Sequence, residues 1–297
     1  PLAAKRHGWI AALLALAAGA ALLLPPLEGI ALPGYAAIAC LLLGALPAAF
    51  AATGTTHPFD VRDLVAFDRL SEPRISPDGR LVVFTVSSLD MAANKRRSDL
   101  WLVGTDGTGL RQLTRDAAAD TSGAWSADGS TVYFLSTRSG LAQVWQLPLS
   151  GGEAQPLTAL PLDVDNFVLS RDGRRLALSM QVFPGTTPAQ TRKRLDDTAA
   201  GKATGRTYDR LFFRHWDTWE DGRRSHIFVL PASGGEPVDV MQAMDADAPS
   251  RPFGGSNEYT FTPDGGSLVF GARNVGREEA WSTNFDLFVA PVDGSGA

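Results

Sequence analysis

The sequence is poor in the residues from which most covalent and metal sites are built. Cys40 is the only cysteine among 297 residues, so neither an intrachain disulfide nor a cysteine-based zinc site can form. The four histidines (His7, His57, His215 and His226) lack metal-ligand spacing, and we predict no metal and no cofactor. The net charge is −5 without a long run of one sign, which argues against nucleic acid as a partner.

A serine placed for nucleophilic attack is missing as well. No Gly-x-Ser-x-Gly motif occurs, since Ser256, Ser267 and Ser295 stand in GGSNE, GGSLV and DGSGA. That motif sets a serine on the sharp strand-to-helix turn that exposes its hydroxyl. We therefore assign no catalytic residue and expect these 297 residues to be inactive alone.

Long hydrophobic runs are limited to the N-terminus. Two Ala/Leu-rich stretches, 9–24 and 35–52, are separated by prolines and a glutamate. Each is at or below the ~20 residues that span a bilayer. The second ends in Ala49-Phe50-Ala51, the small-x-small pattern that a signal peptidase reads.

We interpret residues 1–51 as an export signal preceded by extra residues and cleaved after about Ala51. One or two membrane spans are the alternative, and lipid attachment at Cys40 is a weaker one. The first reading predicts a periplasmic or secreted protein. The alternative predicts an anchored protein that meets the membrane only through this segment.

One turn-and-strand pattern occurs four times after Thr53. A Ser/Thr-x-Asp-Gly turn precedes a run of apolar and β-branched residues, as in RISPDGRLVVFTVSS. The turn aspartates are Asp78, Asp128, Asp172 and Asp264, at separations of 50, 44 and 92 residues. The first two separations match the ~40–50 residue period of a four-stranded propeller blade. The third equals two periods, or one period with an insertion.

A second, Gly-rich turn shows whether the 92-residue separation contains two periods or one period with an insertion. It follows each first turn, at 105–109, 150–153, 233–236 and 293–296, and an alternating strand precedes it each time. A β-sandwich also strings short strands between Gly-rich turns, but it does not require two turn motifs in fixed order. We predict an all-β fold: a β-propeller of four-stranded antiparallel blades, about four in this chain, with the ring incomplete.

The predicted propeller covers 52–297. Its blades lie near 67–115, 116–160, 161–243 and 244–297, and the last is truncated. The third carries an inserted excursion over 186–225, whose charged first part predicts a short surface helix. Its second part gathers aromatic side chains, among them His215, Trp216 and Trp219. These rings either cover the blade edge, which is the commoner role, or contact a ligand.

The strings YDRLFFRHWDTWEDGRRSHIFV and EEAWSTNFDLFVAPVDG, with the blade turns, resemble the N-terminal propeller of prolyl oligopeptidase-family serine exopeptidases. Within that family the dipeptidyl-peptidase V-like and acylaminoacyl-peptidase-like members are the most similar. The resemblance covers nearly all of 57–297. The blade turns are shared with the TolB propeller, whereas RHWDTWEDG and AWSTNFDLF are more specific.

The resemblance implies a propeller that gates the active site of an α/β-hydrolase domain expected after Ala297, where the family's Ser-Asp-His triad lies. Such an enzyme removes dipeptides or acylated residues from short peptides, so its partners would be those peptides and its own hydrolase domain. The alternative is a non-catalytic, TolB-like propeller that binds proteins. A sugar-processing propeller would need paired catalytic carboxylates, and nothing marks such a pair.

A further constellation could contact substrate. An exopeptidase that removes dipeptides must hold a protonated N-terminus, which suits carboxylates at a fixed distance from the nucleophile. Glu278 and Glu279 are adjacent, and Trp281 and Asn284 follow them. A solvated loop is the alternative interpretation of this pair, and the one we favour. With His215, Trp216 and Trp219, these four complete the candidate substrate-binding residues.

Overall fold

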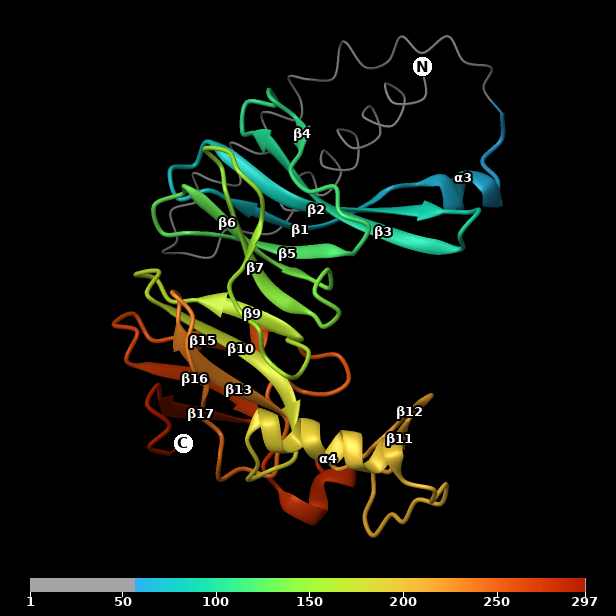
Figure 1. The fold of residues 1–297 in the computed structure, drawn as a ribbon, viewed down its shortest axis with the longest axis vertical. Coiled ribbons are helices and arrows are strands. Elements are labelled where there is room, and N and C mark those ends of the chain that lie inside the picture. The colour runs from blue at the N-terminus through green and yellow to red at the C-terminus, as the bar shows by residue number, and fades with distance from the viewer. Residues whose placement is uncertain (1–56, 297) are drawn as a thin grey trace. The chain divides into compact units, whose positions relative to one another are not determined.

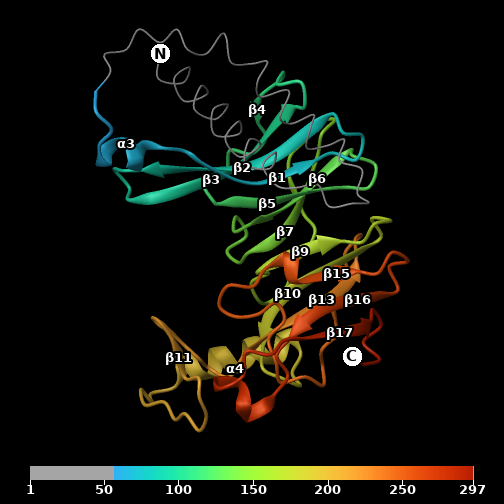
Figure 2. The ribbon, with the colours of Figure 1, turned by 180° about the vertical axis from the view of Figure 1, so that it is seen from behind.

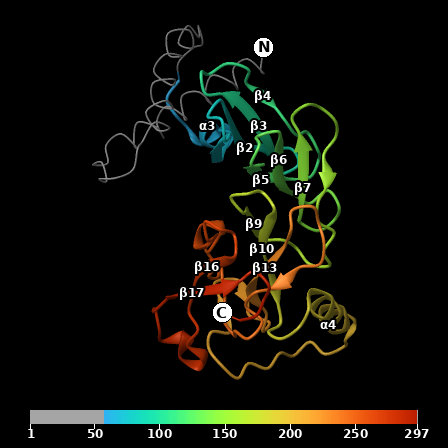
Figure 3. The same ribbon diagram turned by 90° about the vertical axis from the view of Figure 1, so that its left-hand side faces the viewer.

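The computed structural model describes residues 57–296, drawn in colour in Figures 1 to 3. Two compact units divide the chain, the first ending at Phe134 and the second starting at Leu135. The strands are β1 (Arg69–Ile75), β2 (Leu81–Asp90), β3 (Lys95–Gly104), β4 (Arg111–Gln112), β5 (Asp120–Trp125), β6 (Thr131–Ser136), β7 (Gln143–Pro148), β8 (Gln155–Pro156), β9 (Asn166–Leu169), β10 (Arg175–Val182), β11 (Arg214–His215), β12 (Thr218–Trp219), β13 (Arg224–Pro231), β14 (Val238–Asp239), β15 (Tyr259–Phe261), β16 (Ser267–Ala272) and β17 (Asp286–Pro291). The helices are α3 (Val61–Ala66), α4 (Pro188–Ala200) and two short 3₁₀ turns, η2 (Ser256–Glu258) and η3 (Gly276–Ala280).

The strands form small sheets in sequence order. Blade 1 is β1-β2-β3-β4, blade 2 is β5-β6-β7-β8, blade 3 is β9-β10-β13-β14, and blade 4 is β15-β16-β17. Neighbouring strands within blades 1, 3 and 4 pair antiparallel. A repeated meander of this kind is the unit of a β-propeller. The predicted all-β propeller, incomplete and with one excursion, is confirmed.

Hydrogen bonds within the first turn explain why its Ser/Thr-x-Asp-Gly sequence recurs in each blade. In blade 2, Ser126 donates its hydroxyl to Asp128 Oδ1 at 2.6 Å and accepts the backbone N–H of Thr131 at 3.0 Å. Gly129 takes φ +71°, which a side chain would strain. The Ser/Thr–Asp bond is 2.6 Å in all four blades. Each turn is therefore closed by its own residues.

Blades 1 and 2 are close-packed where β5 lies against β2 and β3. A Cβ on Gly123 would lie 3.2 Å from Val83 Cγ2 and 3.4 Å from Leu100 Cδ2, so the interface leaves no room for a larger side chain. Glu72 adds a polar link between β1 and β5, because it accepts the backbone N–H and hydroxyl of Ser122 at 2.8 and 3.0 Å.

Blades 3 and 4 share one buried apolar cluster. Blade 3 contributes Ile227 and Val229, and blade 4 contributes Leu268 and Phe270, all at most 4% exposed. The hydroxyl of Tyr259 also donates to Asn166 Oδ1 at 2.7 Å. Figures 2 and 3 show the two sheets side by side, with β17 on the far side from β10.

The excursion of blade 3 leaves β10 and returns at β13. Its charged part forms α4, which lies beside the end of β10 (Figure 1). Thr187 caps this helix by accepting the N–H of Gln190 at 3.2 Å, and Pro188 occupies its first turn. The aromatic part forms the β11–β12 hairpin. No helix among residues 57–296 combines the length and hydropathy of a membrane span.

The N-terminal interpretation concerns residues that the structure does not describe. The candidate export signal or membrane segment over 1–51, Cys40 included, lies outside the described range.

Candidate functional site

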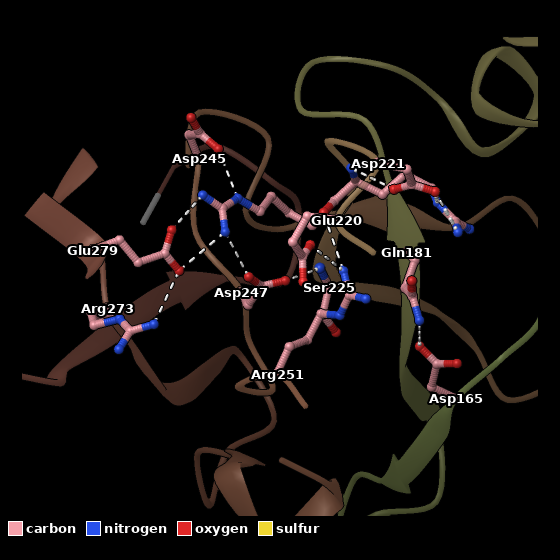
Figure 4. Close-up of polar contacts among 12 residues, drawn as sticks. Asp165, Gln181, Glu220, Asp221, Ser225, Asp245, Asp247, Arg251, Arg273 and Glu279 are labelled. Atoms are coloured by element: carbon pink, nitrogen blue, oxygen red, sulfur yellow. Dashed lines mark hydrogen bonds and ion pairs between the residues drawn. The ribbon is translucent and has the colours of Figure 1, made fainter. Parts of the chain in front are cut away.

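A group of charged side chains lies where β13 begins and β16 ends (Figure 4). Arg224, the first residue of β13, is at its centre and is 12% exposed. Asp245 and Asp247 come from the connection between β14 and η2, and Glu279 comes from η3. We call these four residues the Arg224 cluster.

All three nitrogens of the Arg224 guanidinium donate hydrogen bonds to carboxylates. Its Nε donates to Asp245 Oδ1 at 2.9 Å, its Nη1 to Asp247 Oδ2 at 2.9 Å, and its Nη2 to Glu279 Oε2 at 2.7 Å. Burial alone would lower the pKa of Arg224, but the bonds to Glu279 and the charge of Asp247 outweigh it, so the pKa lies above its ordinary value. The guanidinium is a fixed positive charge that joins β13 of blade 3 to η3, which lies between β16 and β17 of blade 4.

Two further arginines surround the cluster. Arg273, just after β16, donates to Glu279 Oε1 at 3.2 Å, and Arg210 in the excursion donates to Asp245 Oδ2 at 2.8 Å. Asp247 also accepts the backbone N–H of Ser225 at 2.7 Å. The carboxylates of the cluster therefore each have a second partner.

A second set of charges is less completely paired. Arg251 donates to Glu220 Oε2 at 3.3 Å, and Gln181 is 3.5 Å from Asp165 Oδ2. Burial raises the pKa of both Glu220 and Asp165, with the charge of Arg251 opposing it in each case. Asp221 behaves differently, since its bonds from Arg223 outweigh burial and lower its pKa.

The aromatic residues of the excursion separate into two groups. Tyr208, Phe213 and Trp219 stack with centroid distances of 5.6 to 6.1 Å. His215 and Trp216 instead meet Phe253, from the connection that also carries Arg251, at 5.7 and 5.3 Å. Trp216 is 74% exposed and Phe253 72%. The first group packs the hairpin, whereas Trp216 and Phe253 of the second present exposed apolar surface.

The candidate residues from the sequence are not brought together as one set. Glu279 lies in the Arg224 cluster and is 14% exposed, while Glu278 is exposed and its carboxylate has no partner within 57–296. Trp281 is 72% exposed, and the amide of Asn284 donates to Asp286 at 3.2 Å. His215, Trp216 and Trp219 lie on the hairpin. Their proposed contact with substrate stays a prediction.

Sequence reasoning missed the residues that organise the site. Asp245 and Asp247 alternate in MDADAP, a spacing that puts two side chains on one side of an extended segment. That signal marks a polar face but not its partner, because Arg224 lies 21 residues earlier in the chain. Arg251 and Phe253 belong to no recognisable motif, so nothing in the sequence pointed to them.

The described residues supply neither a metal site nor a serine–histidine pair. No group of three or more candidate metal ligands forms within 57–296. Nδ1 of His226 bonds Asp239 at 2.9 Å, and its buried Nε2 has no partner. His57 pairs with Asp63 and Pro58, and His215 with aromatic rings. None of these three described histidines contacts a serine hydroxyl.

Comparison with known proteins agrees with this architecture. A family model described as "TolB beta propeller domain" matches residues 64–187. Dipeptidyl-peptidase 5 of Porphyromonas gingivalis is 28% identical over 243 residues, covering 80% of this chain and 35% of the relative. Dipeptidyl-peptidase 5 of Arthroderma otae is 27% identical over 264 residues, covering 83% and 35%.

Among solved structures, the acylaminoacyl peptidase of Pyrococcus horikoshii superposes with a TM-score of 0.53 at 15% identity, covering 79% of this chain and 32% of that one. At 15% identity this match supports the fold alone. The chain spans about a third of the length of the curated relatives it matches. The described residues form a β-propeller domain that is similar to relatives named dipeptidyl-peptidase 5 and, in its fold alone, to an acylaminoacyl peptidase.

Proposed function

We propose that this propeller gates substrate in an exported serine exopeptidase that removes dipeptides or acylated residues from short peptides. The likeness to relatives named dipeptidyl-peptidase 5, over four-fifths of the chain, carries the proposal. A propeller set over an active site admits short flexible peptides and excludes folded chains, and it removes competing water.

The chemistry belongs outside these residues. The sequence has no elbow serine, and the described histidines are engaged elsewhere or buried without a hydroxyl partner. The proposal therefore assigns the serine, acid and base to an α/β-hydrolase domain of the same protein, with the propeller as its lid.

A protein-binding propeller without chemistry is the second candidate. The match of residues 64–187 to the TolB propeller family favours it. The excursion over β11 and β12 favours the peptidase, because a propeller that only binds proteins has no need of an inserted aromatic hairpin beside a charged cluster.

Peptidase assays on the whole gene product separate the two. The peptidase proposal expects turnover of dipeptidyl or acyl-amino-acid chromogenic substrates, its loss on treatment with a serine-reactive inhibitor, and no cleavage of a folded protein. The 297-residue chain alone should show no turnover. A whole gene product that is folded but inert on both substrate classes would support the binding propeller instead.

The substrate-binding role of Glu278 and Glu279 is tested in the same assay. A carboxylate that holds the substrate ammonium contributes a charge-assisted bond, so Glu→Gln should lower kcat/KM for free-amine dipeptide substrates by roughly tenfold to 150-fold. N-blocked substrates lack the ammonium and should lose little. Glu278 is the more available of the two, because Glu279 is already held by Arg224 and Arg273. Equal losses on both substrates would assign the residue a structural role.

Export is tested separately. A reporter fused to residues 1–60 should be cleaved near Ala51 and released from the membrane. An uncleaved, membrane-embedded fusion would favour the spanning alternative.

A further inference from the structure

The excursion of blade 3 contains a stretch of exposed backbone without secondary structure. Residues 201–207, GKATGRT, follow α4 on the way to the β11–β12 hairpin (Figure 1), and all seven are exposed. No backbone N–H or C=O of residues 202–207 forms a hydrogen bond to another residue within 57–296. Backbone in this state is where proteolytic cuts concentrate, because it can enter an extended substrate cleft without first unfolding.

This stretch also carries the side chains that a basic-specific endopeptidase recognises. Lys202 and Arg206 are both exposed, and neither has a carboxylate partner in the part of the chain that the structure describes. Arg210, only a few residues later, is held by Asp245 at 2.8 Å. The three residues between Lys202 and Arg206 are Ala, Thr and Gly, which are small. The two basic side chains are therefore free to enter a specificity pocket.

Exposed basic residues elsewhere lie in paired backbone. Residues 95–97, Lys-Arg-Arg, are exposed, but they belong to β3 and pair in register with residues 88–90 of β2. Binding them in a protease cleft would require local opening of this ladder, which costs free energy. Exposure alone does not separate the two stretches, but the unpaired backbone singles out 202–207.

The chain is anchored on both sides of this stretch. Before it, Thr191 of α4 is 0% exposed and accepts the backbone N–H of Phe183 at 3.2 Å, and Cζ of Arg194 lies 3.7 Å from the centre of the Phe183 ring. After it, Tyr208 stacks on Trp219 of the hairpin at 5.8 Å. Neither anchor depends on the continuity of residues 202–207.

The strands that flank the excursion hold its two sides together. β10 precedes the stretch and β13 follows it, and the two strands pair antiparallel over eight residues. Leu178 and Phe228, which are opposite each other in this pairing, are at most 1% exposed. A cut within 202–207 would leave this ladder and its buried side chains intact. The two fragments would then stay in one folded unit.

We propose that residues 202–207 are a processing site, at which a trypsin-like endopeptidase specific for lysine or arginine cuts the chain while blade 3 stays assembled. Hydrolysis of the Lys202–Ala203 or Arg206–Thr207 bond adds the hydroxyl of water to the carbonyl carbon and a proton to the new amine. An exopeptidase of the kind proposed above does not hydrolyse an internal bond, so the cut belongs to a second enzyme.

The cut changes how the aromatic hairpin is held. In the intact chain the β11–β12 hairpin is joined to the blade through α4 on one side and through β13 on the other. After the cut only the connection to β13 is covalent. We expect faster amide hydrogen exchange in the hairpin, with the protection of β10 and β13 unchanged.

Limited digestion of the whole gene product with trypsin tests the proposal. Among cuts within 57–296, the first should produce a fragment that begins at Ala203 or Thr207, as read by mass spectrometry. The two fragments should elute together from a sizing column and separate only in denaturant. A variant with both Lys202→Gln and Arg206→Gln should slow this cut by at least about tenfold, because the remaining basic residues need local opening.

The matched control carries Arg96→Gln and Arg97→Gln, which remove two exposed basic residues from paired backbone and should leave the rate of the first cut unchanged. A first cut at residues 95–97, or at another basic residue within 57–296, would overturn the proposal. Fragments that separate without denaturant would overturn it as well, as would a gene product that resists trypsin until it unfolds. No readout needs peptidase activity, so an inert gene product cut in this way would keep the site and remove the proposed function.

Discussion

The repeated turns and the Arg224 cluster both rest on carboxylates, but they use them in opposite ways. Asp128 accepts from Ser126 and Ser130, each two residues away, and its pKa falls to about 2 through those bonds. Asp247 and Glu279 instead meet Arg224 from 23 and 55 residues away, with 11% and 14% exposed side chains. The turn shapes its own backbone, whereas the cluster ties separate segments together. Removing a partner should therefore lower the free energy of unfolding far more in the cluster than in a turn.

Replacing Arg224 should give the largest effect. Arg224→Met leaves Asp247 and Glu279 largely buried without their shared cation, which destabilises by about 3–5 kcal/mol when a buried pair is broken this way. Urea unfolding of the chain at pH 7 measures it. The matched control is Arg210→Met, whose 43% exposed side chain pairs with Asp245 alone among residues 57–296 and should cost less than about 1 kcal/mol. Equal losses in the two variants would remove the distinction drawn between buried and exposed pairs.

The adjacent glutamates sharpen the same comparison at smaller scale. Glu279→Gln removes the charge that accepts from Arg224 and Arg273, and we expect a loss of about 2 kcal/mol in the free energy of unfolding. Glu278→Gln changes an exposed carboxylate without a described partner and should stay within about 0.5 kcal/mol. The urea denaturation midpoints of the two variants measure this difference in stability. If Glu278→Gln proved the costlier change, the positions assigned to the two side chains would be wrong.

The sequence predicted the parts of this molecule whose interactions are local. Ser126, Asp128 and Gly129 specify their own turn, so the blade repeat, the fold class and the place of the excursion follow from reading it. The helix α4 was also predicted from its charged segment. Each of these features depends on residues within one turn or one strand.

The site was harder to predict because its contacts are long-range and occur once. Arg224 stands in GRRSH, where nothing distinguishes it from Arg223, and only folding brings it to Glu279. The sequence drew attention to Glu278 and Glu279 as a pair, yet η3 turns one inward and leaves the other in solvent. Adjacent residues on a short helical turn point in different directions, so a pair in the sequence need not act as a pair in space.

The pH dependence of stability should differ in sign between the repeated turns and the Glu220–Arg251 pair. Burial raises the pKa of Glu220 above 4.5, so the folded chain holds that proton more tightly than the unfolded chain does. Its contribution is then most favourable below 4.5 and declines as the pH rises through the higher folded pKa. Glu220→Gln should remove this decline, which urea unfolding between pH 4 and 7 measures. An unchanged slope in the variant would show that Glu220 does not titrate differently on folding.

The smallest effect should come from the turn itself. Asp128→Asn keeps an oxygen that can accept the Ser126 hydroxyl and the backbone N–H of Ser130, so at pH 7 the thermal midpoint should barely move. Any small loss comes from the missing charge, which stabilises the native turn at neutral pH and not in acid. In the native chain the pKa of Asp128 lies at about 2 instead of 3.8, so its contribution is complete above 3.8 and disappears as the pH falls toward 2. Thermal unfolding at pH 7 and pH 3 should show the two proteins converging as the pH is lowered, because the native chain loses a contribution that the variant never had. A variant that lost as much at pH 7 as Glu279→Gln would mean that these turns hold the blades together through charge. The local hydrogen bonds would then be a poor guide to what the repeated aspartates do.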